Sequence, residues 1–124
     1  MQMKSLDPAC SIQQQMSENA QNAGPVVLVN LFTLDPADEA AFLNAWTDDA
    51  AFMKARPGFI STQLHRAIGK CPTYFNYAIW ETMDVFRAAF TDPDFRARLA
   101  DYPSSVIASP HLFQRVAVPG ICVA

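Results

Sequence analysis

Two segments rich in aromatic and β-branched residues lie only four residues apart, and this spacing constrains the fold more than any other feature. Phe59–Ile68 and Thr73–Glu81 each have the composition of a strand. Gly69–Pro72 between them carries the glycine and proline typical of a turn. Because parallel strands need a crossover of a dozen or more residues, the short link predicts an antiparallel hairpin.

Before this hairpin the sequence predicts a strand followed by a helix. Val26–Leu34 is apolar except at Asn30 and Thr33, which suits a strand covered on both faces. Asp35-Pro36 predicts a helix N-cap followed by proline in the first turn. Apolar residues then recur at helical spacing until Arg56-Pro57-Gly58, and we expect them to form the buried stripe: Phe42, Leu43, Trp46, Ala50 and Met53.

After the hairpin the pattern changes back to helical. Met83–Phe90 predicts a helix with Phe86 and Phe90 inward, and Asp92-Pro93 caps a further turn or two. A loop over 103–110 and a final strand over 112–118 complete the chain. The order strand, helix, strand, strand, helix, strand predicts an α+β, ferredoxin-like βαββαβ fold, with helices on one face of an antiparallel sheet. The open face needs a cover, so we expect a homodimer whose facing sheets enclose a cavity.

The N-terminal segment differs from the rest. Residues 1–24 form a polar extension rich in Gln, Asn and Ser, and residues 25–124 form the folded domain. Asp7-Pro8 predicts the start of a short helix that runs to about Gln21. With only Ile12 and Met16 on one stripe, this helix either packs on a neighbouring surface or remains a mobile tail.

Composition excludes several classes of function. The chain has 124 residues, a net charge of −3 and scattered basic residues, which argue against nucleic acid or an acidic membrane as a partner. We find no apolar run long enough for a signal peptide or a membrane span. Three cysteines without CxxC spacing fit reduced thiols in a cytoplasmic protein and predict no metal site.

Alternation along the second hairpin strand predicts a pocket. Asn76, Ala78 and Trp80 share one face, so a polar amide, a gap and a large indole point into the same space. This arrangement is typical of a small, mostly apolar binding pocket. The alternative is that Trp80 is an ordinary core residue and Asn76 an edge residue.

Three other polar residues are candidates. Asn30 is the only amide in its apolar run, where an unpaired buried polar group is costly, although a bond to a neighbouring backbone group would also satisfy it. His65 and His111 have a reference pKa suited to proton transfer near neutrality. Each histidine is equally compatible with a surface position at a strand end.

Over residues 26–95 the chain resembles the antibiotic biosynthesis monooxygenase domain family of dimeric α+β barrels. The matching residues are Val26–Phe32, Phe42, Trp46, Pro57-Gly58-Phe59, Ala78-Ile79-Trp80-Glu81, Phe86 and Asp92–Phe95. The family includes cofactor-free, quinone-forming oxygenases, haem-degrading enzymes and members without an assigned activity.

The resemblance implies different site residues for the two enzyme branches. In the oxygenase branch Asn76 and Trp80 would be catalytic, and Phe86 stands where that branch can carry a tyrosine. In the haem-degrading branch Asn30 and Trp80 match, but the histidine position falls near Leu99, and 83–102 contains no histidine. The haem-degrading alternative is therefore disfavoured.

The sequence thus favours a cofactor-independent monooxygenase that oxidises an aromatic or quinol-like small molecule with O2. We expect substrate contacts from Asn30, His65, Phe86 and Phe90. Two alternatives stay open: a non-catalytic or stress-related small-molecule-binding protein of the same fold, and an isomerase or cyclase that turns over substrate without consuming oxygen.

Overall fold

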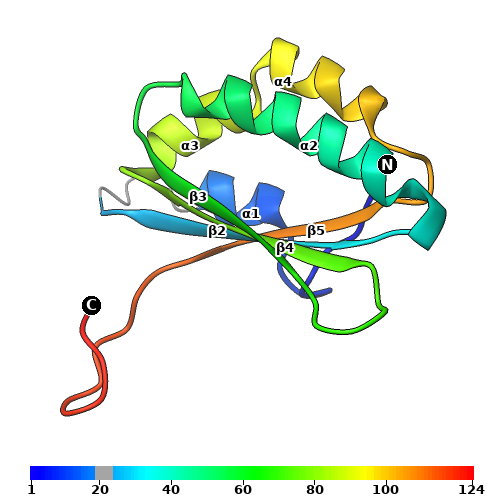
Figure 1. Ribbon diagram of the computed structural model, residues 1–124. Coiled ribbons are helices and arrows are strands. Elements are labelled where there is room, and N and C mark those ends of the chain that lie inside the picture. Colours follow the sequence, from blue (N-terminus) through cyan, green and yellow to red (C-terminus); the bar gives the residue numbers. More distant parts are fainter. Residues whose placement is uncertain (19–23) are drawn as a thin grey trace.

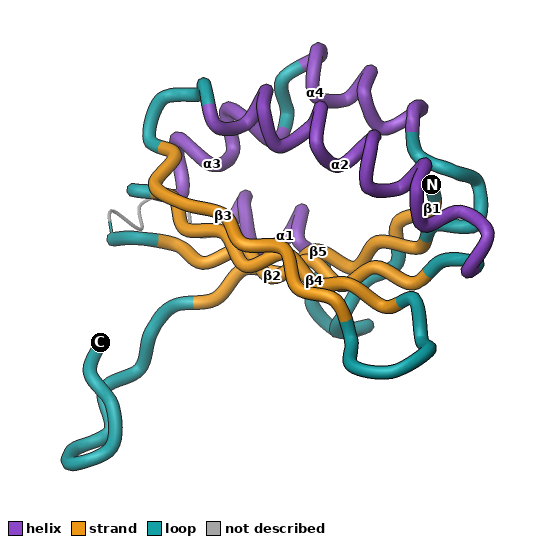
Figure 2. The backbone as a smooth tube through the Cα atoms, in the orientation of Figure 1, coloured by secondary structure: helices purple, strands orange, loops and turns teal. Residues whose placement is uncertain are grey.

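A five-stranded sheet carries a layer of helices on one face in the computed structural model, which describes residues 1–18 and 24–124 (Figure 1). The strands are β1 (Gln2–Met3), β2 (Val26–Thr33), β3 (Phe59–Arg66), β4 (Thr73–Trp80) and β5 (Ile107–Phe113). The α-helices are α1 (Ile12–Glu18), α2 (Glu39–Lys54), α3 (Met83–Phe90) and α4 (Pro93–Arg98), with short 3-10 turns at Pro36–Asp38 and Leu99–Asp101. Figure 2 shows the two layers, with α2, α3 and α4 above the sheet.

The sheet order β1-β5-β2-β4-β3 confirms the predicted ferredoxin-like α+β fold. β2, β3, β4 and β5 pair antiparallel, with β3 and β4 forming the predicted hairpin. β1 adds a fifth strand, parallel to β5, that the sequence did not predict. The sheet does not close into a barrel within the chain.

A β-bulge in β3 reverses which face its residues point to. Phe59 lies opposite Trp80, yet Ser61 lies opposite Ile79, so Ile60 is an extra residue on the β3 side. Simple alternation puts Phe59 and His65 on the same face. Because of the bulge, they point to opposite faces.

The last strand begins five residues earlier than the predicted Leu112, and it ends at Phe113 instead of Val118. Pro110 made this stretch read as loop, since proline cannot donate to a β-ladder. The carbonyls of Val106 and Ala108 accept hydrogen bonds from Gln2 and Lys4. Pro110 is also even-numbered, so its backbone nitrogen faces the same side as these two carbonyls. Because β1 has already ended there, no strand hydrogen bond is lost.

The N-terminal segment packs on β5 of its own chain. Helix α1 starts at a reciprocal capping box: Gln14 N–H donates to Ser11 Oγ at 3.1 Å, and Ser11 N–H donates to Gln14 Oε1 at 2.8 Å. Asp7, the predicted cap, holds a separate turn through the N–H of Ala9. The predicted helix end near Gln21 lies outside the described residues.

Gln15 fastens α1 to the free edge of β5. Its side-chain Nε2 donates to the Leu112 carbonyl at 2.9 Å, and its Oε1 accepts from the Leu112 N–H at 3.0 Å. The side-chain amide of Gln15 therefore satisfies the Leu112 N–H and C=O, as a neighbouring strand would do, just beyond the end of β1. Ile12 and Met16 on the same helix enter the buried core with Trp80 and Phe86.

Helix α2 buries the predicted stripe except at Leu43, since Trp46, Ala50 and Met53 are partly buried and line the pocket. Phe42, Ala45 and Asp49 are its buried residues, whereas Leu43 is exposed. Asp35 precedes the 3-10 turn without capping it through its side chain. The unexpected member of the stripe is the carboxylate of Asp49.

Candidate functional site

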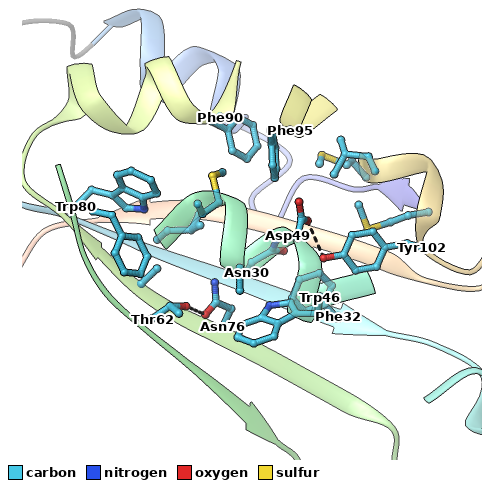
Figure 3. Close-up of a pocket in the computed structure, with 18 residues that line it drawn as sticks. Asn30, Phe32, Trp46, Asp49, Thr62, Asn76, Trp80, Phe90, Phe95 and Tyr102 are labelled. Atoms are coloured by element: carbon cyan, nitrogen blue, oxygen red, sulfur yellow. Dashed lines mark hydrogen bonds between the residues drawn. The ribbon is translucent and has the colours of Figure 1, made fainter. Parts of the chain in front are cut away.

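A pocket of about 70 Å³ lies between the sheet and the helices of a single chain. Strands β2, β3 and β4 form its floor, and residues of α2, α3, α4 and the following 3-10 turn form its roof (Figure 3). We expected the site in a cavity between two facing sheets. This pocket lies within one chain instead, because the pocket-facing residues of β2 and β4 point toward the chain's own helices.

Asn76 projects from β4 into this pocket with a fixed orientation. The Thr62 hydroxyl on β3 donates a hydrogen bond to Asn76 Oδ1. In Figure 3 the Asn76 amide nitrogen points away from Thr62 and toward the middle of the pocket. Asn76 therefore presents a hydrogen-bond donor to any molecule that enters.

Asn30 lies directly opposite Asn76 in the β2–β4 register. Its Oδ1 is buried and has no hydrogen-bond partner among the described residues. A buried amide oxygen without a partner is costly, so the site is built to receive a donor there. Asn30 supplies an acceptor beside the Asn76 donor.

Trp80 forms an aromatic wall at one side of the pocket. Only 1% of its surface is exposed, and Phe59 and Phe86 contact it edge-on, with ring centroids 5.4 and 5.9 Å away. Phe90 lines the pocket, but Phe86 lies behind it, between Phe90 and Trp80. The structure thus brings Asn30, Asn76, Trp80 and Phe90 together and leaves Phe86 in the supporting layer.

His65 does not reach this pocket. It lies on the open face of the sheet, where its ring stacks on Phe75 with centroids 4.2 Å apart. The register is the physical reason: His65 lies opposite Phe75, whereas Leu64 lies opposite the pocket residue Asn76. His111 is also on the far side from the pocket, within 3.2 Å of the Gln15 side chain.

Asp49 is the site residue that sequence reasoning missed. It lines the pocket from α2, is only 7% exposed, and its Oδ2 accepts a 2.8 Å hydrogen bond from the Tyr102 hydroxyl. Burial raises the pKa of Asp49 from 3.8 to about 6, although the Tyr102 hydrogen bond and the charge of Arg98 oppose the rise. The signal was present: Asp49 is one helical turn beyond Trp46 and Ala45, on the apolar stripe.

Among the described residues, no three His, Cys, Asp or Glu side chains gather as a metal site requires. Leu99, near which the family resemblance implies a haem-ligating histidine, lines the pocket as an apolar residue. The described helices also include none long and apolar enough to cross a membrane.

This α+β fold, with a pocket lined by two amides and an indole beneath its helices, agrees with a family that sequence comparison identifies. The model of the antibiotic biosynthesis monooxygenase family matches residues 25–100, more than half of the chain. The chain therefore belongs to this family.

Individual relatives agree with this assignment. Deoxynogalonate monooxygenase from Streptomyces nogalater is 36% identical over 74 residues, which cover 60% of this chain and 62% of that protein. The crystal structure of SnoaB, a cofactor-independent oxygenase from the same organism, superimposes with a TM-score of 0.71 at 30% identity, covering 79% of this chain and 99% of SnoaB. A Caulobacter crescentus protein of the same family assignment gives 0.71 at 23% identity over 82% and 98%, which supports the fold alone.

Proposed function

We propose that this protein is a cofactor-independent monooxygenase that oxidises an aromatic or quinol-like small molecule with O2 in the pocket beneath its helices. The observation that carries the proposal is the convergence of Asn30, Asn76 and Trp80 on one buried apolar space. The names of two relatives, a monooxygenase and a cofactor-independent oxygenase, support the same reaction class.

These residues suit a reaction in which the substrate is its own reductant. Once deprotonated, an electron-rich ring passes one electron to O2, and the resulting radical pair combines to a hydroperoxide. Loss of water leaves a carbonyl, so one oxygen atom enters the product and the substrate supplies all four electrons. The protein must hold the flat ring, stabilise the anion and exclude water.

Each side chain has a role in this scheme. The Asn76 amide N–H stabilises the anionic oxygen of the substrate, and the unpaired Asn30 Oδ1 accepts from a second substrate hydroxyl. Trp80 provides a flat wall for the ring. The pocket is smaller than the roughly 150 Å³ that holds benzene in an engineered cavity, so ring entry requires side chains to move.

Oxygen uptake with a panel of anthrones and hydroquinones tests this function. Wild type should consume O2 in step with quinone formation, and Asn76→Ala and Trp80→Phe proteins that remain folded should lose most of this activity. Asn44→Ala, an exposed amide on α2, is the matched control and should behave as wild type. Equal inertness of wild type and both variants across the panel contradicts the proposal.

We further propose that the chain is a homodimer that pairs through the open face of its sheet. That face carries Val29, Leu31 and Phe113, and the last two are partly exposed at 36% and 42%. Burial of such a patch by a second copy would remove it from water. Sedimentation should show a dimer at micromolar concentration, and a single monomer species would refute this assembly.

The three cysteines, Cys10, Cys71 and Cys122, are free thiols, as expected of a reducing compartment. We therefore propose a cytoplasmic location, to be tested by cell fractionation.

A further inference from the structure

Asp49 occupies the part of the pocket where the proposed oxidation needs a proton acceptor. Figure 3 shows Trp80 on one side of the pocket and Asp49 with Tyr102 on the other, with Asn30 and Asn76 between them. One carboxylate oxygen, Oδ2, is held by the Tyr102 hydroxyl at 2.8 Å. The other, Oδ1, is buried and has no hydrogen-bond partner among the described residues.

We propose that Asp49 is the general base of this site and that Tyr102 positions it. This inference rests on the proposed function. The two amides and the indole of that site are not bases, and both histidines lie outside the pocket. A carboxylate fixed through one oxygen, with the second oxygen free, is the geometry that proton abstraction from a bound ring requires.

The proposed step balances as a simple proton transfer. Asp49 Oδ1 forms a bond to a proton of the substrate hydroxyl or ring carbon, and the electron pair of the broken bond stays on the substrate as an enolate or phenolate. O2 is the oxidant of the next step, as in the proposed reaction. The proton held by Asp49 then moves to the terminal peroxide oxygen. When the remaining C–H bond of the oxidised carbon breaks, its electron pair forms the C=O bond, the O–O bond breaks, and the departing hydroxide takes up the released proton to become water.

The charges around Asp49 set when it can act. Besides Tyr102, its titratable neighbours are Arg98 from α4, Asp101 from the 3-10 turn and Asp48 from α2 itself. The described pocket residues of the sheet are all non-titratable. Desolvation raises the pKa of Asp49 to about 6, so the carboxylate is mostly ionised at neutral pH and still near the pKa range of an efficient base.

A pH–rate comparison of three variants tests the assignment. In wild type, kcat should rise with pH through an acid limb near pH 6. Asp49→Asn keeps an acceptor for the Tyr102 hydroxyl but cannot take a proton, so it should lose about 100-fold or more in kcat at pH 7.5, together with the acid limb. Asp48→Asn removes the same charge one residue away on the exposed side of α2. It should keep the rate and an acid limb, with at most a small move of the limb to lower pH, because the Asp48 charge is the weakest of the causes that raise the pKa of Asp49.

Tyr102→Phe distinguishes a base from a merely structural carboxylate. It removes the hydrogen bond that positions Asp49 and lowers its pKa, so the acid limb should move to higher pH. The rate on the alkaline plateau should fall by less than in Asp49→Asn, because the carboxylate itself remains. This variant also decides the question if Asp49→Asn does not fold.

The outcomes separate this inference from the proposed function. A wild type that consumes no O2 with any member of the panel refutes both. An active wild type refutes the base alone if Asp49→Asn matches Asp48→Asn in rate and pH profile, or if Tyr102→Phe leaves the limb in place. Loss of the limb in Asp49→Asn and its displacement in Tyr102→Phe support the assignment.

Discussion

Asn30 and Asn76 sit directly opposite each other across the β2–β4 ladder, and both side chains enter the same pocket. Their amides present complementary atoms, since Asn76 offers its N–H groups while the Asn30 oxygen lacks a partner among the described residues. Adjacent strands thus build a donor–acceptor pair on a rigid floor, and side chains on strands are positioned more accurately than side chains on loops.

The two amides should contribute differently to turnover. Asn76→Ala removes the donor to the developing anion, and we expect a fall of about 100-fold in kcat. Thr62→Val keeps Asn76 but removes the hydroxyl that orients it, so we expect an intermediate loss of roughly 10-fold. Steady-state oxygen uptake measures both. A Thr62→Val rate as low as that of Asn76→Ala would argue against a role limited to orientation.

Substitution of Asp49 should raise stability at neutral pH. Folded Asp49 keeps its proton up to about pH 6, whereas the unfolded carboxyl loses it near 3.8. Between these values the folded state binds more protons, so the stability of wild type falls as pH rises and remains lower above pH 6. Asp49→Asn lacks this penalty, which is about 3 kcal/mol at most.

Urea unfolding at pH 4 and pH 8 measures this effect. The difference in unfolding free energy between Asp49→Asn and wild type should be more favourable to the variant at pH 8 than at pH 4. Asp48→Asn should show no comparable pH dependence, because Asp48 is exposed. If this difference in unfolding free energy is the same at both pH values, the pKa of Asp49 in the folded protein is not raised.

Met3 should limit the size of ring that the pocket accepts. It lines the pocket from β1, while Gln2 beside it points outward and is exposed. Met3→Ala enlarges the space, so we expect kcat/KM for a two-ring or three-ring substrate to rise roughly 10-fold relative to a one-ring substrate. Gln2→Ala should leave this ratio unchanged. If the ratio is unchanged in both variants, Met3 does not limit the size of the ring that the pocket accepts.

Gln15 should be worth about 2 kcal/mol to the folded state. Gln15→Ala leaves the part-buried Leu112 N–H and C=O without their side-chain partners, and each unmet group is costly. Gln13→Ala on the same helix is exposed and should be close to neutral. Chemical denaturation measures both. Equal stability of the two variants would show that Gln15 is not what fastens α1 to β5.

Alanine substitutions at Gly58 and Gly69, which both have positive φ, should distinguish the cost of a steric clash from the cost of backbone strain. A Cβ at Gly58 would lie 2.6 Å from the Cβ of Val85, whereas a Cβ at Gly69 would meet no atom within 4 Å. Gly69→Ala should therefore cost about 1 kcal/mol through its φ of 99° alone. Gly58→Ala should cost about 3 kcal/mol, since overpacking adds to the strain. Thermal unfolding that ranks Gly69→Ala as the more damaging change would contradict this account.

The sequence predicted those parts of the site that follow from regular alternation. Asn76 and Trp80 share a face because β4 is regular, and Asn30 was found as the single amide in an apolar strand. His65 was chosen for the pKa typical of histidine, and residue type does not tell which face of β3 the side chain lies on. Asp49 was not predicted, because the predicted stripe of α2 contained apolar residues alone, although a carboxylate at the same helical spacing is itself a signal.

The fold was predictable to a similar degree. The four-residue turn and the two helices fixed the order of elements. The edge of the sheet was not predictable, because it depends on long-range packing: β1 pairs with Ile107 and Ala108 near the other end of the chain. Pro110 concealed the strand that both β1 and α1 use.

The β-bulge in β3 and the strict alternation of β2 and β4 divide the side chains of the sheet into two sets, one on each face. In β2 and β4 the even-numbered residues face the helices, and the odd-numbered residues lie on the opposite face of the sheet. Amino-acid changes at odd positions can therefore alter the outer surface without changing the pocket lining, and changes at even positions can alter the pocket lining without changing that surface. One set of backbone hydrogen bonds therefore supports both the pocket lining and the outer surface, and the side chains of each can evolve separately.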